Sequence, residues 1–247
     1  MALTYDDVRR WSAEELNRRL SGPPEEVAGI LRVCAEAGVI EAKALYAQAL
    51  LDGRGVARNP AEALRLFIEA AQAGHVMAMN MVGRCCDQGW GTPVDKALAA
   101  RWYKAAADNG LDWAMYNLAT LYCLGEGVPL DRAEALRLYR KAMELGHVKS
   151  INMVGGFYED GWVVERDMEK AAALYRQAAE GGDFRGQFNH ARLLIAAGNR
   201  DEAAAWLRRI PETATPAFLD KARAWLADHA PELVAALAPD DPSASAL

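Results

Sequence analysis

The sequence is poor in the features that mark several protein classes. Its 247 residues include only 4 cysteines and 10 prolines, and no apolar run approaches the length of about 18 that a membrane helix needs. So few cysteines exclude a disulfide scaffold, and a glycine count of only 20 excludes collagen. Basic residues are outnumbered, with 28 Lys and Arg against 34 Asp and Glu. Because nucleic-acid binding usually needs a clustered basic surface, which is missing, we expect no nucleic-acid partner.

Signals for export and for catalysis are also missing. The N-terminus MALTYDDVRRW carries early acids and no apolar segment, so we expect no secretory signal and a cytoplasmic location. The chain has no phosphate loop, H-E-x-x-H or G-x-S-x-G motif, and Gly53-Arg54-Gly55 joins two expected helices rather than a strand and a helix. The cysteines and histidines lack the spacing of metal ligands. We therefore expect no catalytic residue, no metal and no cofactor.

What the sequence does contain is alanine, about a fifth of the chain, arranged in an internal repeat. Alanine has the highest intrinsic helix propensity, so this composition favours close-packed helices. Glycine, alanine, aromatic and Asn or Asp residues each recur at a constant spacing of 36 residues, as from Gly38 to Gly74. Such a period is typical of stacked supersecondary units. The first glycine position comprises Gly38, Gly74, Gly110, Gly146 and Gly182.

Each repeated position has a structural meaning. An Asn or Asp precedes every second alanine-rich run, where it can cap a helix N-terminus, and a glycine follows each run, where a left-handed residue ends a helix. Each repeat is therefore predicted to be a pair of antiparallel helices. The first helices are predicted at 40–52, 76–88, 112–124, 148–160 and 184–197, and the second helices at 60–73, 95–108, 131–145, 167–180 and 200–210.

Helices of this length are marginal alone in water, so the pairs are expected to be stable only when they stack on one another. The predicted organisation has five parts. N-terminal capping helices and a half repeat occupy 1–39, four full repeats 40–182, a shorter fifth repeat 183–211, C-terminal capping helices 212–238 and a flexible tail 239–247.

These repeated positions resemble the Sel-one-like repeat (SLR) family, a relative of the tetratricopeptide repeat. The second repeat reads AMNMVGRCCDQGWGTPVDKALAARWYKAAADNG, and the third reads AMYNLATLYCLGEGVPLDRAEALRLYRKAMELG. The resemblance covers 40–182, and the fifth repeat, with its short connector, looks more like a plain tetratricopeptide repeat. It implies an all-α fold, a right-handed α/α superhelical solenoid with N- and C-terminal capping helices.

The resemblance also implies a function. Such solenoids, often bacterial, act as non-enzymatic scaffolds or adaptors that bind a protein or peptide on the concave face lined by the first helices. An inhibitor or immunity-type protein for a neighbouring toxin or enzyme is an alternative within binding. Some secreted, cysteine-rich members are described as binding or hydrolysing β-lactams, so a hydrolase of β-lactam or peptidoglycan-type substrates is an alternative of another class. This chain lacks the cysteine spacing of those members.

The concave face is predicted at positions 3, 6, 10 and 13 residues after each repeat glycine, because these positions vary where core positions repeat one residue type. Aromatic side chains and arginine are typical binding anchors, and asparagine can pair with a peptide backbone. A partner segment is expected across repeats two to four, although an ordinary mixed surface would give the same pattern. The candidate partner-binding residues are Met77, Asn80, Arg84, Asp87, Trp113, Tyr116, Thr120, Lys149, Asn152, Arg185, Phe188 and Arg192.

A second candidate surface lies on the connectors. Trp90 and Trp162 occupy the same connector position in repeats two and four. Either each ring folds back over its own connector, or the pair forms a further contact surface or an oligomer interface.

Overall fold

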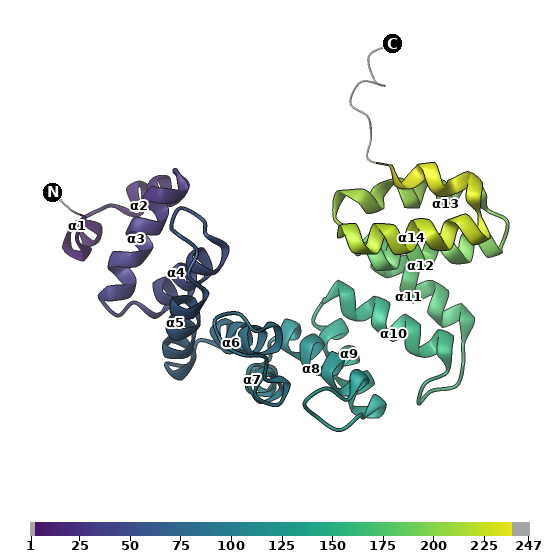
Figure 1. Cartoon of the computed structure of the whole chain (residues 1–247), viewed down its shortest axis with the longest axis horizontal. Helices are drawn as coiled ribbons and strands as arrows, with labels where there is room; N and C mark the ends of the chain where they lie inside the picture. Colours follow the sequence, from purple (N-terminus) through teal and green to yellow (C-terminus); the bar gives the residue numbers. More distant parts are fainter. Residues whose placement is uncertain (1–2, 239–247) are drawn as a thin grey trace, which may run out of the picture. The chain divides into compact units, whose positions relative to one another are not determined.

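The computed structural model describes residues 3–238, so the tail predicted at 239–247 lies outside the described residues. Within this range the chain consists of helices without any strand (Figure 1). None of the described helices is long and apolar enough to cross a membrane. The elements are α1 (Tyr5–Arg9), α2 (Ala13–Leu20), α3 (Pro24–Glu36), α4 (Ile40–Asp52), α5 (Pro60–Gln72), α6 (Val76–Gln88), α7 (Lys96–Asp108), α8 (Asp112–Leu124), α9 (Arg132–Glu144), α10 (Val148–Asp160), α11 (Met168–Glu180), α12 (Phe184–Ala196), α13 (Arg200–Arg209), the 3-10 helix η1 (Ile210–Glu212), α14 (Pro216–His229) and the 3-10 helix η2 (Pro231–Leu237).

The helices begin and end where the repeated residues predict. Asn59, Asp95 and Asp167 each accept a hydrogen bond from the backbone N–H three residues on, at 2.8–3.1 Å, which satisfies a donor left open at a helix start. Gly38 and its four equivalents have φ between +86° and +91°, the left-handed conformation that ends a helix. All ten predicted repeat helices are confirmed to within one residue at each end.

Neither α1 nor η1 was predicted as a separate helix. The five residues of α1 are opened by a capping box in which Asp7 N–H donates to Thr4 Oγ1 at 3.3 Å and the Asp7 carboxylate accepts from Thr4 N–H at 3.0 Å. This helix lies outside the repeats, so their period gives no signal for it. The Thr-x-x-Asp pattern itself is the only local indication.

The chain forms two compact units, Met1–Asp131 and Arg132–Leu247. In the first unit each helix from α3 to α8 packs on its neighbours in sequence, as stacked hairpins do. The Tyr103 ring of α7 lies so close to Gly83 of α6 that a Cβ there would come within 2.6 Å of the ring. Ala99 and Ala106 are fully buried on either side of Tyr103. Small residues on one helix thus make room for the aromatic ring of the other.

The second unit stacks α9 to α13 in the same way and ends in a cap. The cap is aromatic: Phe218 of α14 packs edge-on against Phe184 of α12 at 4.7 Å between ring centroids, and Trp225 packs against Phe188 at 5.5 Å. The helix η2 closes the far side against α13 and α14. The fold is therefore an all-α solenoid of helical hairpins with terminal caps, as predicted.

Candidate functional site

The candidate site is the face formed by the first helices of the repeats, which we call the first-helix face; α4, α6 and α8 carry it in the first unit. Met77 of α6 and Trp113 of α8 stand at the same repeat position and are 45% and 42% exposed. Tyr116 and Thr120 follow on α8 and are half-buried. Exposed sulfur and indole side chains on successive helices offer the apolar contact area on which binding surfaces depend.

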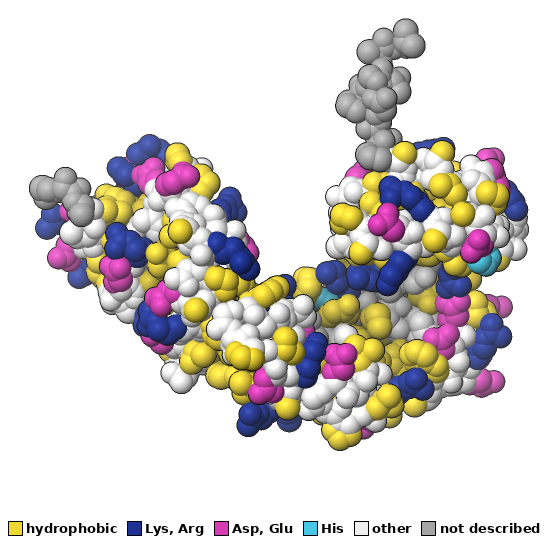
Figure 2. All heavy atoms as spheres, viewed as in Figure 1, with side chains coloured by type: hydrophobic (Ala, Val, Ile, Leu, Met, Phe, Trp, Pro, Cys, Tyr) yellow, Lys and Arg dark blue, Asp and Glu magenta, His cyan; other side chains and the backbone are white. Residues whose placement is uncertain are grey.

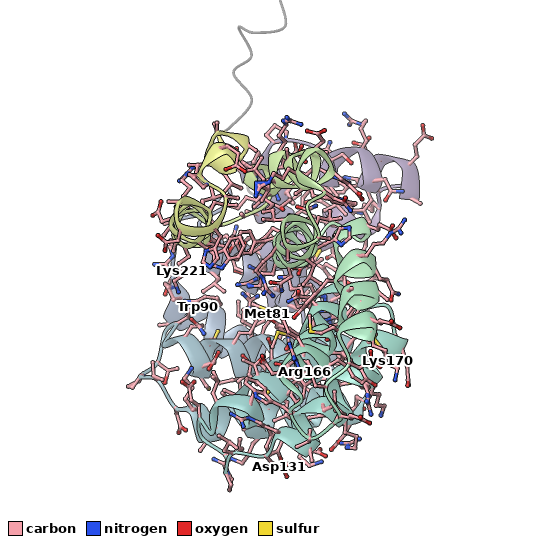
Figure 3. The ribbon with its side chains drawn as sticks, turned by 90° about the vertical axis from the view of Figure 1, so that its right-hand side faces the viewer. Met81, Trp90, Asp131, Arg166, Lys170 and Lys221 are labelled. Atoms are coloured by element: carbon pink, nitrogen blue, oxygen red, sulfur yellow. The ribbon has the colours of Figure 1, made fainter. Side chains whose placement is uncertain are left out.

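Arg84 provides the positive charge of this face. Its side chain is exposed, its guanidinium lies 5.0 Å from the centroid of the Trp90 ring, and Nη1 approaches Met81 Sδ at 3.7 Å. Both Trp90 and Met81 are labelled in Figure 3. Arg84 makes no ion pair with any residue of the described range 3–238. Stacking on the ring holds the cation in place, and the N–H groups other than that on Nη1 can donate to an acceptor.

The prediction that Asn80 and Asn152 lie on the open surface is wrong. They are 3% and 6% exposed. Asn80 Oδ1 accepts a hydrogen bond from Asn117 Nδ2 at 3.0 Å, and Asn152 Oδ1 accepts one from Asn189 Nδ2 at 2.9 Å. Each bond joins the first helices of two successive repeats, because position 6 turns toward the next first helix rather than toward solvent. These amides therefore stabilise the stack.

Asp87 lies deeper than an open binding position would. Its carboxylate accepts from Lys96 Nζ at 2.6 Å and from the Tyr103 hydroxyl at 3.5 Å. Lys96 also pairs with Glu126 at 3.1 Å. The hydrogen bond from Lys96 to Asp87 raises the pKa of this lysine in spite of its partial burial. Asp87 thus links the first helix of its repeat to the second.

In the second unit, α10 and α12 carry the first-helix face. Arg192 donates two hydrogen bonds to the Glu159 carboxylate at 2.7 and 2.9 Å, and the Tyr175 hydroxyl donates a third at 2.6 Å. Burial opposes ionisation of Glu159, but these hydrogen bonds outweigh it and hold the pKa of the carboxyl below its usual range. Arg192 is therefore already engaged within the protein.

The remaining predicted residues of this unit lie toward its basic end. Arg185 is exposed, and its guanidinium stacks on Phe184 at 4.5 Å. Phe188 is half-buried against α14, and Lys149 is half-buried near the carboxyl of Asp183. Burial raises the pKa of Asp183 even though Gly186 N–H donates to it. Basic side chains gather on this part of the unit in Figure 2, and Lys221 of α14 is labelled in Figure 3.

The comparison with known families decides what kind of repeat this is. A family model described as the Sel1 repeat matches residues 40–75, 76–111, 114–147 and 148–183, more than half of the chain. The chain belongs to the Sel1 repeat family. Sel1 repeats mediate protein interactions, and proteins built from them are generally non-enzymatic scaffolds.

Solved structures share the Sel1 fold. The structure of c5321, described as a protective antigen present in uropathogenic Escherichia coli strains, is 26% identical in sequence and has a TM-score of 0.65. The match covers 87% of this chain and 47% of c5321, so this chain spans about half the length of c5321. A Sel1 repeat protein from Oxalobacter formigenes is 22% identical with a TM-score of 0.73, covering 88% of this chain and 89% of the other. The immunity protein Pa5087 from Pseudomonas aeruginosa is 17% identical with a TM-score of 0.56, covering 83% and 78%. No curated protein matches the chain significantly.

The first unit also contains a hollow that was not predicted from the sequence. A hollow of about 330 Å³ opens in the first unit between α2, α3 and α4. Its apolar lining includes Leu20 and Leu45, two exposed leucines, while Gln48 and Asp52 line its polar side. The sequence signal that could have indicated this hollow is Leu45. It occupies the same repeat position as Asn117 and Asn189 but has no amide group that could hydrogen-bond to the neighbouring first helix.

The cysteine and histidine side chains, which could in principle support catalysis or metal binding, are buried or half-buried in the protein or pack against aromatic rings. All four cysteines are free, and burial raises the pKa of the Cys85 thiol to about 11, so this thiol is protonated near neutral pH. His190 is buried edge-on against Trp206, and His229 stacks on Trp225. Within residues 3–238 no group of His, Cys, Asp and Glu side chains could hold a metal ion.

The two connector tryptophans both stack on arginine, but on different ones. Trp90 meets Arg84 of its own repeat, whereas Trp162 lies 4.2 Å from the guanidinium of Arg132, in the preceding second helix. Trp162 also packs edge-on against Phe157 at 5.7 Å. Each ring is thus anchored on the protein while part of it stays exposed.

Proposed function

We propose that the chain is a non-enzymatic scaffold that binds a protein or peptide partner on its first-helix face. The observation that carries the proposal is the composition of this face in the first unit, where exposed Met77 and Trp113 lie on the first helices of successive repeats and Arg84 stacks on Trp90 without an ion pair in the described range. Exposed apolar side chains together with a positioned arginine are the usual composition of binding hot spots. Membership of the Sel1 repeat family supports an interaction role.

The second unit supports the same proposal with a different composition. Arg185 is exposed on the first-helix face and is held by aromatic rings, with Lys149 and Phe188 on the same face. Because Arg192 is neutralised by Glu159, the exposed Arg185 is the cation of this face that we expect a partner to meet. A partner carboxylate is the complementary group.

The test is capture of the partner from the source cell, followed by measurement of its affinity for purified variants. Trp113→Ala combined with Arg84→Glu should weaken partner binding by about a hundredfold, because it removes one anchor and reverses the charge of another. The matched control is Leu130→Ala with Arg101→Glu, which alters one exposed apolar residue and one exposed arginine away from the face. Unchanged binding by the first variant would contradict the proposal.

Two further outcomes distinguish the alternatives. The Pseudomonas immunity protein shares the fold, so capture of a toxin or an enzyme whose activity the chain blocks would specify an inhibitor of the immunity type. A chromogenic β-lactam assay should show no turnover. Turnover that a single point variant abolishes would replace the scaffold with a hydrolase.

A further inference from the structure

The connector of the fourth repeat departs from the other three at one residue. Gly55, Gly91 and Gly127 have φ between +69° and +75°, and a Cβ on any of them would lie 2.0–2.3 Å from a backbone atom at the start of the preceding second helix. The fourth repeat carries Val163 at this position, with φ +54°. A β-branched residue in this region of φ is strained.

The strain at Val163 is not offset by burial in the protein. Its side chain is 56% exposed, and the neighbouring Trp162 is 38% exposed. Trp162 is nevertheless fixed, because it stacks on Arg132 at 4.2 Å and meets Phe157 edge-on. Two apolar side chains are therefore held at the surface on an anchored connector. Strained residues of this kind cluster at functional sites.

A hollow of about 490 Å³ lies beside this connector, against α9. Val163 and Val164 contribute the accessible apolar surface, Leu136 is itself buried, and most of the other lining residues are charged. We call this surface the Val163 edge; it comprises Ala133, Leu136, Arg137, Arg140, Lys141, Glu144, Val163 and Val164.

The charges of the Val163 edge are unbalanced. Arg137 pairs with Glu134 at 2.6 Å, and Arg140 donates to the Tyr158 hydroxyl at 2.9 Å. Neither Arg140 nor Lys141 makes an ion pair with a residue of the described part of the chain, and Glu144 is the only acid in the lining. On a chain of net charge −6, this is a local cationic surface around an apolar centre. A carboxylate is the group that complements it.

We propose that the Val163 edge is a second docking surface, and that it binds an acidic protein segment. The segment places one apolar side chain against Val163 and Val164 and an adjacent carboxylate against Lys141 and Arg140. Burial of Val163 and Trp162 by the segment supplies the apolar contact that the free protein lacks. This surface is formed by α9 and the connector after α10, so it does not depend on the first-helix face.

The test is a selection of random 12-residue peptides on the intact chain, with affinities then measured by fluorescence anisotropy. The selected peptides should combine Asp or Glu with a neighbouring apolar residue. Lys141→Glu should weaken their binding at least about tenfold, and Val163→Gly about threefold. Arg101→Glu, an equal charge change at the repeat position of Arg137, should leave binding unchanged. Trp113→Ala with Arg84→Glu should also leave it unchanged, which separates this surface from the proposed function.

Three results would overturn the proposal. One is a selection that returns no peptide sensitive to Lys141→Glu. Another is a set of selected peptides without acidic residues. The third is a dimer that forms at high protein concentration, by light scattering, and is dissolved by Lys141→Glu, since the occupant would then be a second copy of the chain. Melting curves of each variant show whether a loss of binding comes from unfolding.

Discussion

Asn117 donates from its side-chain amide to Oδ1 of Asn80 at 3.0 Å, so a single hydrogen bond joins α8 to α6 inside the first unit. Asn80 is almost fully buried, and a buried carbonyl that loses its donor costs more than the bond itself contributes. The same arrangement recurs between Asn189 and Asn152 in the second unit. The contact between first helices is therefore partly polar and specific in both units.

We predict that Asn117→Leu destabilises the protein by about 1–3 kcal/mol, because it leaves the buried Asn80 oxygen without its donor. The double variant Asn80→Leu, Asn117→Leu should recover most of the loss, since it replaces both polar partners with apolar ones. Urea unfolding of the single and double variants measures the coupling. If the destabilisation of the double variant equalled the sum of those of Asn80→Leu and Asn117→Leu, the hydrogen bond would not stabilise the contact between α6 and α8.

The example shows why the sequence predicted the helices better than the face. Repeated residues such as Asn59 and Gly38 determine helix ends through local geometry, so the helix boundaries could be read from the chain directly. The burial of Asn80 depends on which way position 6 turns between two stacked helices. Position 6 varies between repeats, and that variation has two causes, ligand contact or pairing with a neighbour, which the sequence does not separate.

The Val163 edge could not be predicted from the sequence for a related reason. Val163 interrupts a glycine column in the sequence, which marks the repeat as different without saying how. Its positive φ, the approach of Trp162 to Arg132, and the cations of α9 beside it become visible only when the connector is placed against the preceding helix. Contacts between adjacent repeats depend on the size of the side chains on the connector and on the helix that it faces. The recurrence of one residue type along the sequence does not reveal these contacts.

Two glycines with positive φ should respond differently to alanine. At Gly110 a Cβ would meet nothing within 4 Å, so Gly110→Ala should cost only the conformational strain, about 1–2 kcal/mol. At Gly127 a Cβ would lie 2.2 Å from the Lys96 carbonyl carbon, so Gly127→Ala adds a clash with backbone and should cost at least about 3 kcal/mol. Chemical denaturation of the two variants gives the comparison. Equal losses would mean that the connector does not touch α7 closely.

The ion pair between Glu159 and Arg192 should make stability depend on pH. The pKa of Glu159 is depressed in the folded state, so its contribution is complete above the ordinary glutamate pKa of about 4.3 and is lost as the pH falls through the lower folded value. Glu159→Gln removes this titration and keeps an oxygen for Tyr175. The parent should exceed this variant in unfolding free energy near pH 6, and the difference should shrink toward pH 3. A difference independent of pH would contradict the assignment.

The last prediction concerns Val163, where glycine should be the more stable residue. Its positive φ costs about 1–3 kcal/mol for a β-branched side chain, while glycine raises the entropy of the unfolded chain by an amount worth about 1 kcal/mol. Since the side chain is largely exposed, little packing is lost, and Val163→Gly should raise the melting temperature or leave it unchanged. Val164→Gly is the matched control. Val164 has no positive φ and is half-buried, so this change should lower the melting temperature. If both variants melted below the parent by the same amount, Val163 would be unstrained. Its exposed position would then no longer support a docking partner.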